Sequence, residues 1–183
     1  MRRLMDAGKT LFTECGYEVT TIDQITSLAG VSRAAFYLHF ETKADIIRAL
    51  VIDVSHSLED RYAALAKLGP SPSAQAVTQW TREFLQACRS DGTTLLLYRT
   101  THPNSNLFDE IAFYDAMIEL LGTGYPRFAA TKSDPFAKAG ALLFFFQLQA
   151  LIRQLTAGDR LDWDSLCQAT AQYFLSFTGE GKR

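Results

Sequence analysis

Apolar residues recur every three or four positions along most of the chain, which is the period of an α-helix with one buried face. Capping residues, glycines and prolines divide this pattern into about nine helices, so the sequence predicts an all-α fold. The first four predicted helices cover residues 2–15, 21–29, 32–40 and 42–68. The other five cover residues 74–89, 94–102, 106–121, 134–157 and 162–177, with a turn at 90–92 and a loop of at most one helical turn at 122–133.

Two of these helices follow each other very closely between Thr21 and Phe40. Thr21 and Gln24 have the spacing of a capping box, in which each residue caps the other at the start of a helix. Gly30 can take the left-handed conformation that ends a helix, and Ser32 can cap the next helix almost at once. Two short helices joined by so few residues must cross at a steep angle. This is the helix-turn-helix arrangement used in DNA binding.

The second of these helices has an apolar face and a polar face. Phe36 and Phe40 lie four residues apart, so they share one face and can pack on the preceding helix. The long polar side chains point elsewhere and can reach phosphates or base edges: Arg33, Tyr37, His39 and, just beyond the helix, Lys43. An ordinary helical hairpin with a solvated polar face would show the same pattern, so that alternative stays open.

The same stretch resembles the N-terminal domain of TetR-type transcriptional regulators. The matching residues are Phe12, Gly16, Tyr17, Thr20, Thr21, Ala29 to Ser32, Phe36 to Phe40, Thr42 and Lys43. The resemblance implies a helix-turn-helix DNA-binding domain in residues 1–48 and a helical effector-binding and dimerisation domain in residues 49–183. It also implies a regulator, most simply a repressor, that a small effector releases from a palindromic operator.

On this basis, nine residues are candidates for contact with double-stranded operator DNA. We expect Arg33 to reach a base edge such as guanine, and Ala34 and Ala35 to approach thymine methyl groups. The other candidates are expected to hold phosphates or to line the same surface: Thr21, Gln24, Ser32, Tyr37, His39 and Lys43. In a dimer, the two recognition helices should lie about 34–36 Å apart, one turn of DNA.

Residues 74–156 are rich in aromatic side chains, which could form a core or line a pocket for a small apolar or aromatic effector. The resemblance favours a pocket, and its candidate lining is Trp80, Phe84, Tyr98, Met117, Phe145 and Gln149. The long helix predicted over residues 42–68 begins beside the DNA-reading stretch and ends in this second region. Its position makes it the candidate transmitter between the two.

The last two predicted helices carry more apolar surface than one chain of this size can cover. Residues 139–152 are apolar almost all round, and the final helix carries a broad apolar stripe. This pattern predicts a two-fold four-helix bundle across a homodimer, the arrangement that the family resemblance also implies. The expected interface residues are Phe146, Ala150, Tyr173, Phe174 and Phe177.

Charge complicates the DNA-binding interpretation. The chain carries 18 basic and 20 acidic residues, a net charge of −2, whereas a DNA-binding protein usually shows a basic surface. Residues 1–48 hold six of each sign, and Arg33 is the only charged side chain between Gln24 and Phe40. Binding must therefore rest on a few well-placed contacts from each half of a dimer.

The sequence gives little support for catalysis or for a metal or other cofactor. The three cysteines and three histidines are scattered, without the spacing of zinc ligands or of a nucleophile and its base: Cys15, Cys88, Cys167, His39, His56 and His102. There is no phosphate-binding glycine loop. We expect neither an enzyme nor a disulfide framework. The rival binding class is a helical adaptor that contacts only protein and has no DNA affinity.

Membrane association is not expected either. No run of 18 apolar residues lacks a polar interruption, and the first six residues lack the apolar core of a signal peptide. An apolar content of 48% and a charged content of 21% are typical of an ordered globular protein. The simplest expectation is a cytoplasmic protein.

Overall fold

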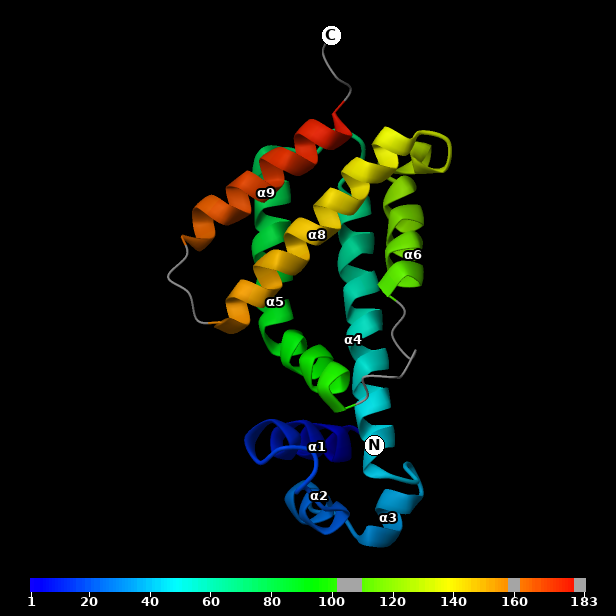
Figure 1. The fold of residues 1–183 in the computed structure, drawn as a ribbon, viewed down its shortest axis with the longest axis vertical. Coiled ribbons are helices and arrows are strands. Elements are labelled where there is room, and N and C mark those ends of the chain that lie inside the picture. The colour runs from blue at the N-terminus through cyan, green and yellow to red at the C-terminus, as the bar shows by residue number, and fades with distance from the viewer. Residues whose placement is uncertain (102–109, 158–161, 180–183) are drawn as a thin grey trace. The chain divides into compact units, whose positions relative to one another are not determined.

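The computed structural model describes residues 1–101, 110–157 and 162–179 (Figure 1). These residues form α-helices, one short 3-10 helix and no strand, which confirms the predicted all-α class. The helices are α1 (Arg2–Glu14), α2 (Ile22–Ala29), α3 (Arg33–Tyr37), α4 (Lys43–Ala66), α5 (Ala74–Thr101), α6 (Glu110–Gly122), α7 (Pro126–Ala129), the 3-10 helix η1 (Ala130–Lys132), α8 (Pro135–Ala157) and α9 (Trp163–Thr178).

The chain forms two compact units. The first unit contains Met1–His56 and the part of α5 that starts at Asp91. The second unit contains Ser57–Ser90 and the chain from α6 onward. Both α4 and α5 therefore contribute residues to each unit. The domain boundary between residues 48 and 49 remains a prediction from the sequence.

The turn predicted at residues 90–92 is wrong, because α5 continues without a break from Ala74 to Thr101. Ser90, Asp91 and Gly92 favour a turn locally. A glycine inside a helix, however, costs only about 1 kcal/mol relative to alanine, and good helix formers flank the segment. The two helices predicted over 74–89 and 94–102 are consequently one.

Two further boundaries differ from the predictions. Pro126 occupies the first turn of α7, and η1 follows directly, so much of the loop predicted at 122–133 is helical. The α-helical part of the segment predicted over 32–40 is limited to α3, although the amide of Phe40 still donates to the carbonyl of Phe36 at 3.0 Å. The predicted helix start at Asn106 lies outside the described residues.

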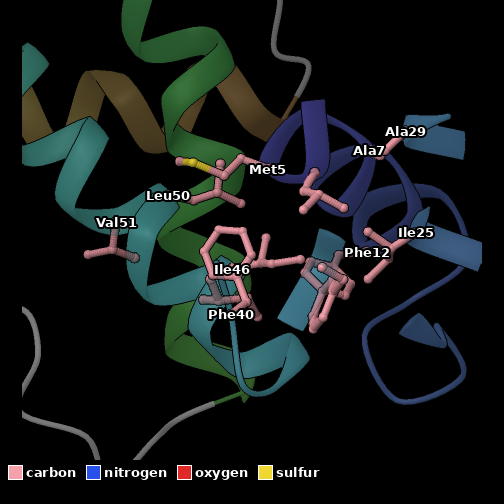
Figure 2. Close-up of a cluster of buried hydrophobic side chains, with 12 residues drawn as sticks. Met5, Ala7, Phe12, Ile25, Ala29, Phe40, Ile46, Leu50 and Val51 are labelled. Atoms are coloured by element: carbon pink, nitrogen blue, oxygen red, sulfur yellow. The ribbon is translucent and has the colours of Figure 1, made fainter. Parts of the chain in front are cut away.

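The core of the first unit joins α1, α2, α3 and α4 (Figure 2). Its apolar side chains come from the helical stripes that the sequence shows: Leu4, Met5, Ala7, Phe12, Ile25, Ala29, Phe36, Phe40, Ile46, Ile47, Leu50 and Val51. Burying each large side chain contributes roughly 1.5–3 kcal/mol. Gly8 lets α1 approach α4 closely, since an added Cβ would lie 2.8 Å from the Cγ2 atom of Ile46.

The core of the second unit is largely aromatic. Phe174 of α9 packs edge-on against Tyr125, with ring centroids 4.9 Å apart, and lies 5.0 Å from the ring of Phe144 in α8. The hydroxyl of Tyr125 donates to the carbonyl oxygen of Leu65 in α4 at 2.7 Å. The only polar atom of this fully buried side chain is thereby paired, which removes most of the cost of burying it.

Helix α8 is both a core helix and a surface helix. It packs against α6, α7, η1 and α9. Its outer stripe nevertheless leaves Phe136, Leu143 and Phe146 exposed by 76%, 56% and 51%. The segment Pro135–Gln154 is long and apolar enough to cross a membrane by length and composition, a criterion that core helices of soluble proteins also meet.

Candidate nucleic-acid interface

The start of α2 is fixed by the capping box that the sequence predicts. The Thr21 amide donates to Oε1 of Gln24 at 2.8 Å, and the Gln24 amide donates to the Thr21 hydroxyl at 3.2 Å. The end of α2 is equally well defined. Gly30 adopts a left-handed conformation with φ 63°, and the amide of Val31 donates to the carbonyl of Thr26 at 3.0 Å. These local bonds set the tight turn into α3.

Helix α3 then presents one face inward and one face outward. The Ser32 hydroxyl accepts from the amide of Ala35 at 3.1 Å, which caps the helix. Phe36 is fully buried and Phe40 is nearly so, and their rings lie 5.9 Å apart, as their spacing predicts. Most predicted DNA contacts are exposed, namely Thr21, Gln24, Ser32, Arg33, Ala34, Tyr37 and His39, whereas Ala35 and Lys43 are partly buried.

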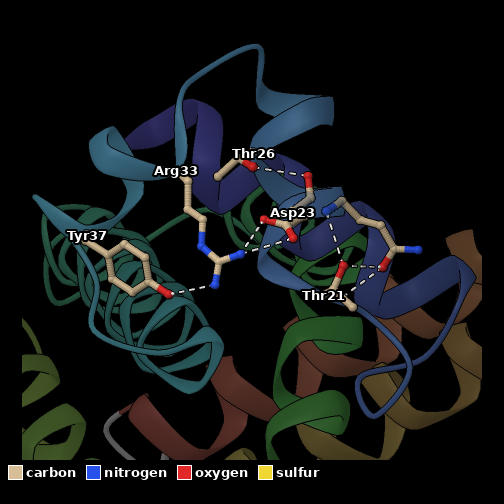
Figure 3. Close-up of polar contacts among 6 residues, drawn as sticks. Thr21, Asp23, Thr26, Arg33 and Tyr37 are labelled. Carbon is tan, nitrogen blue, oxygen red and sulfur yellow. Dashed lines mark hydrogen bonds and ion pairs between the residues drawn. The ribbon is translucent and has the colours of Figure 1, made fainter.

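Arg33 is held between an acid and a phenol (Figure 3). Its Nη1 donates to both carboxylate oxygens of Asp23, at 2.8 and 3.1 Å, and its Nη2 donates to the hydroxyl of Tyr37 at 3.4 Å. The hydrogen bond to Tyr37 and then the attraction of Asp23 raise the pKa of Arg33 above its ordinary value, so the guanidinium stays cationic. Sequence reasoning missed Asp23, which lies ten positions earlier on a different helix.

Lys43 has an unexpected role at the start of α4. Its ammonium donates to the carbonyl oxygens of Tyr17, Glu18 and Thr20 at 2.7, 3.0 and 2.9 Å, and lies 4.4 Å from the ring centroid of Tyr17. A lysine has three N–H donors, and these bonds occupy all three. In this conformation Lys43 ties α4 to the segment before α2 and has no donor left for a phosphate.

Other arginines of the first unit are also engaged. Arg2 pairs with Asp53 and Arg48 pairs with Asp45, which neutralises part of the local positive charge. Arg3 donates from Nη2 to the carbonyl of Gly30 at 3.2 Å, beside the turn of the helix-turn-helix. Sequence reasoning did not select Arg3, because nothing local links the start of α1 to that turn.

Four of the predicted effector-pocket residues are buried in the second unit. Trp80 and Phe84 stack with centroids 4.9 Å apart, and Phe145 lies 5.4 Å from the ring of Tyr62. The Trp80 indole donates to the carbonyl of Arg61 at 2.8 Å. Trp80, Phe84, Met117 and Phe145 are buried, Gln149 is half-buried, and the side chain of Tyr98 lies outside the described residues. A role in effector binding remains a prediction for all of them.

A cavity of about 690 Å³ opens elsewhere in the second unit, between α7, the start of α8 and the end of α9. Arg127, Phe136 and Phe177 contribute to its lining. The Arg127 guanidinium lies 5.8 Å from the ring centroid of Phe136 and pairs with Asp134 at 3.3 Å. None of the five predicted pocket residues whose side chains are described lines this cavity.

The predicted dimer residues occupy different environments. Phe146 and Ala150 are exposed on α8, Phe177 is half-buried, and the half-buried Tyr173 donates from its hydroxyl to the carbonyl of Gly140 at 3.0 Å. The expectation that Phe174 lies at the dimer interface is corrected, because this side chain is fully buried among the aromatic rings of its own chain. The apolar stripe of α9 is broad, and its pattern does not show which edge faces the chain's own core.

Within the described part of the chain, no three His, Cys, Asp or Glu side chains group as metal ligands. Cys15 is exposed, whereas Cys88 and Cys167 are buried. Desolvation raises the pKa of Cys167, which keeps that thiol protonated and unreactive.

Comparison with known proteins agrees with the helix-turn-helix geometry. Residues 4–50 match the model of the family described as bacterial regulatory proteins, tetR family. Over 118 residues the chain is 31% identical to an uncharacterized HTH-type transcriptional regulator, TtgW, of Pseudomonas putida. That match covers 64% of this chain and 75% of TtgW. The HTH-type transcriptional regulator SrpR, also of Pseudomonas putida, is 31% identical over 118 residues, 64% of this chain but only 47% of SrpR.

The complete fold also has a counterpart among solved structures. A transcriptional regulator from Aquifex aeolicus VF5 superposes with a TM-score of 0.65 over 94% of this chain and 96% of the other, at 17% identity. At this identity the likeness concerns the fold alone. It extends beyond residue 50, where the match to the family model ends.

Proposed function

Because this chain belongs to the tetR family of bacterial regulatory proteins, we propose that it regulates transcription by binding double-stranded operator DNA through α2 and α3. One observation carries the proposal. Helix α3 presents Arg33, Ala34 and Tyr37 on the outside of a helix-turn-helix whose inner face is closed by the buried Phe36. A helix held in this way can enter the major groove as a rigid element.

The roles of the exposed groups follow from their chemistry. Arg33 has the planar donor geometry that pairs with guanine O6 and N7, and the small Ala34 and Ala35 leave room for thymine methyl groups. Tyr37 and His39 can donate to phosphates and so set the register of α3 on the duplex. Arg3, beside the turn, is a further phosphate contact in this proposal.

TetR-family regulators bind operator DNA and act as dimers, and the surface of α8 supports the same arrangement for this chain. Its exposed residues Phe136, Ala139, Leu143, Phe146 and Ala150 recur at intervals of three and four, so they form one continuous stripe. A second copy would bury this stripe and place two copies of α3 on a palindrome. Two half-sites would also compensate for the few cations of each first unit.

Release by a small apolar or aromatic effector is the regulatory part of the proposal. The effector would bind in the second unit, where Tyr62, Trp80, Phe84 and Phe145 form a buried, polarisable aromatic cluster. It can shift the protein between DNA-binding and released states only by its difference in affinity for the two. Repression is the simplest outcome of such release. The site of action is the cytoplasm, and we assign the chain no catalytic activity.

The proposal is tested by selecting DNA from a random pool with the purified full chain at low salt. The expected result is an enriched palindrome whose half-sites are one helical turn apart. Enrichment of an asymmetric site would contradict the dimer proposal. If no sequence is enriched and no binding is detected by gel shift at low salt, the helical protein-binding adaptor becomes the better interpretation.

A further inference from the structure

The ion pair between Asp23 and Arg33 lies on the outer side of the helix-turn-helix. The side chains of Arg33 and Asp23 are 59% and 69% exposed, and both Asp23 oxygens accept from the same guanidinium nitrogen. Exposed ion pairs of this kind contribute little to folding stability. Its location on the DNA-facing side suggests a role in recognition instead.

Asp23 is the better-fixed member of the pair. It lies in the first turn of α2, directly inside the capping box formed by Thr21 and Gln24, and its carbonyl accepts from the Thr26 hydroxyl at 3.1 Å (Figure 3). The helix dipole favours a carboxylate at this position whether or not a cation is present. Asp23 is therefore a short, preorganised anchor, whereas an unpaired arginine has many rotamers to lose on binding.

The contact with Asp23 uses only one terminal nitrogen of the guanidinium. An arginine has five N–H donors. Asp23 accepts only from Nη1, Tyr37 accepts from Nη2, and Nε donates to neither. A guanine takes two donors from one edge of a guanidinium, and the edge formed by Nε and Nη2 is not used by Asp23. Arg33 can consequently keep its bond to Asp23 while it contacts a base.

We propose that Asp23 is a specificity-determining positioning residue, which fixes the guanidinium of Arg33 for bidentate contact with one base. The inference rests on the proposed DNA-binding function. Asp23 acts in two ways. It restricts Arg33 to one orientation, and it neutralises the only charged side chain between Gln24 and Phe40. DNA that cannot satisfy Arg33 is then attracted only weakly, because the carboxylate opposes binding to phosphates that lack the matching base.

The decisive variant is Asp23→Asn, which keeps the shape of the side chain and removes its charge. The matched control is Glu14→Gln, which removes one exposed negative charge from the same unit at the end of α1. Each variant and the wild-type chain select DNA from the same random pool. Their affinities for the wild-type selected fragment, and for versions with each base pair replaced, are then measured by fluorescence anisotropy.

For the wild-type chain and Glu14→Gln, the base pair read by Arg33 should show a preference of roughly 5- to 150-fold, the range of a good bidentate contact. For Asp23→Asn that preference should fall at least about fivefold, while preferences at the other positions persist. Affinity for scrambled DNA should rise in both variants, since each loses a negative charge. Adding Asp23→Asn to Arg33→Ala should cause no further loss at that position, because Asp23 acts through Arg33.

Two results would overturn the inference. One is that Asp23→Asn and Glu14→Gln show the same base preference at every position of the site. Asp23 would then influence DNA binding only through its negative charge. The other is an equal loss of preference at all positions together with a lower melting temperature, which would indicate a structural role. Failure of the wild-type chain to select any DNA would refute the proposed function itself, so the two failures are distinguishable.

Discussion

Lys43, the first residue of α4, donates its ammonium group to the carbonyl oxygen of Tyr17 at 2.7 Å and lies over the ring of the same residue. Together with its bonds to Glu18 and Thr20, this contact links two segments that are more than 20 positions apart. The lysine therefore serves the fold of the first unit directly. Any effect of Lys43 on DNA binding has to be separated from its effect on stability.

Replacing Lys43 with alanine should destabilise the chain by about 1–3 kcal/mol, because three carbonyl oxygens lose a charged partner. The change should appear as a lower melting temperature in circular dichroism. Lys67→Ala, at an exposed position near the end of the long helix, is the control and should stay within about 0.5 kcal/mol of wild type. If Lys43→Ala keeps the wild-type melting temperature but binds DNA less tightly, Lys43 contacts a phosphate and does not mainly stabilise the fold.

Tyr37 and Arg33 should affect DNA recognition differently. Tyr37→Ala should weaken binding several-fold at every DNA sequence alike, since it removes a phosphate contact. Arg33→Ala should also relax the preference at one base pair in each half-site, by about 1–3 kcal/mol. Gel shifts on the selected palindrome and its single-base variants separate these effects. Unchanged affinity in both variants would mean that α3 is not the recognition helix.

The dimer proposal predicts opposite consequences for two phenylalanines. Phe146→Glu places a charge on the exposed stripe of α8 and should yield folded monomers in sedimentation. Phe174→Glu places a charge in the aromatic core of the second unit and should unfold it, at a cost of several kcal/mol. Lys138→Glu, on α8 beside the stripe, should leave the dimer intact. A folded dimer of Phe146→Glu would count against α8 as the interface.

The burial of Tyr125 predicts that the folded chain loses stability at high pH. Burial raises the pKa of Tyr125 to about 12, above the value of about 10 expected in the unfolded chain. The native state therefore retains this proton where the unfolded state loses it. Stability from this group is fully present below pH 10 and falls as pH rises through 12.

Tyr125→Phe should reduce that loss of stability between pH 10 and 12. At neutral pH it should cost about 1–3 kcal/mol, because the carbonyl of Leu65 loses its partner. Urea unfolding at a series of pH values measures both effects. Part of the decrease in unfolding free energy at alkaline pH should persist, since burial also raises the pKa of Tyr62. If the unfolding free energy of Tyr125→Phe decreases with pH as steeply as that of the wild-type chain, Tyr125 is not the source of this pH dependence.

Features of the helix-turn-helix that depend on neighbouring residues could be predicted from the sequence. The capping box of Thr21 and Gln24, the left-handed Gly30 and the cap at Ser32 involve residues at most five positions apart, so local pattern predicts them correctly. The inward packing of Phe36 and Phe40 follows from helical period in the same way. These local rules were sufficient to identify the helix-turn-helix and its outer face.

Contacts between residues far apart in the sequence depend on how the helices pack and could not be predicted. Asp23 reaches Arg33 because the turn folds α3 back beside α2, and Lys43 reaches Tyr17 because α4 returns to the start of the domain. The tertiary structure also placed Phe174 in the core and Phe146 on the surface, although both belong to apolar stripes. Helical period shows which residues share a face, but not which neighbour covers it, because coverage depends on how helices far apart in sequence pack together.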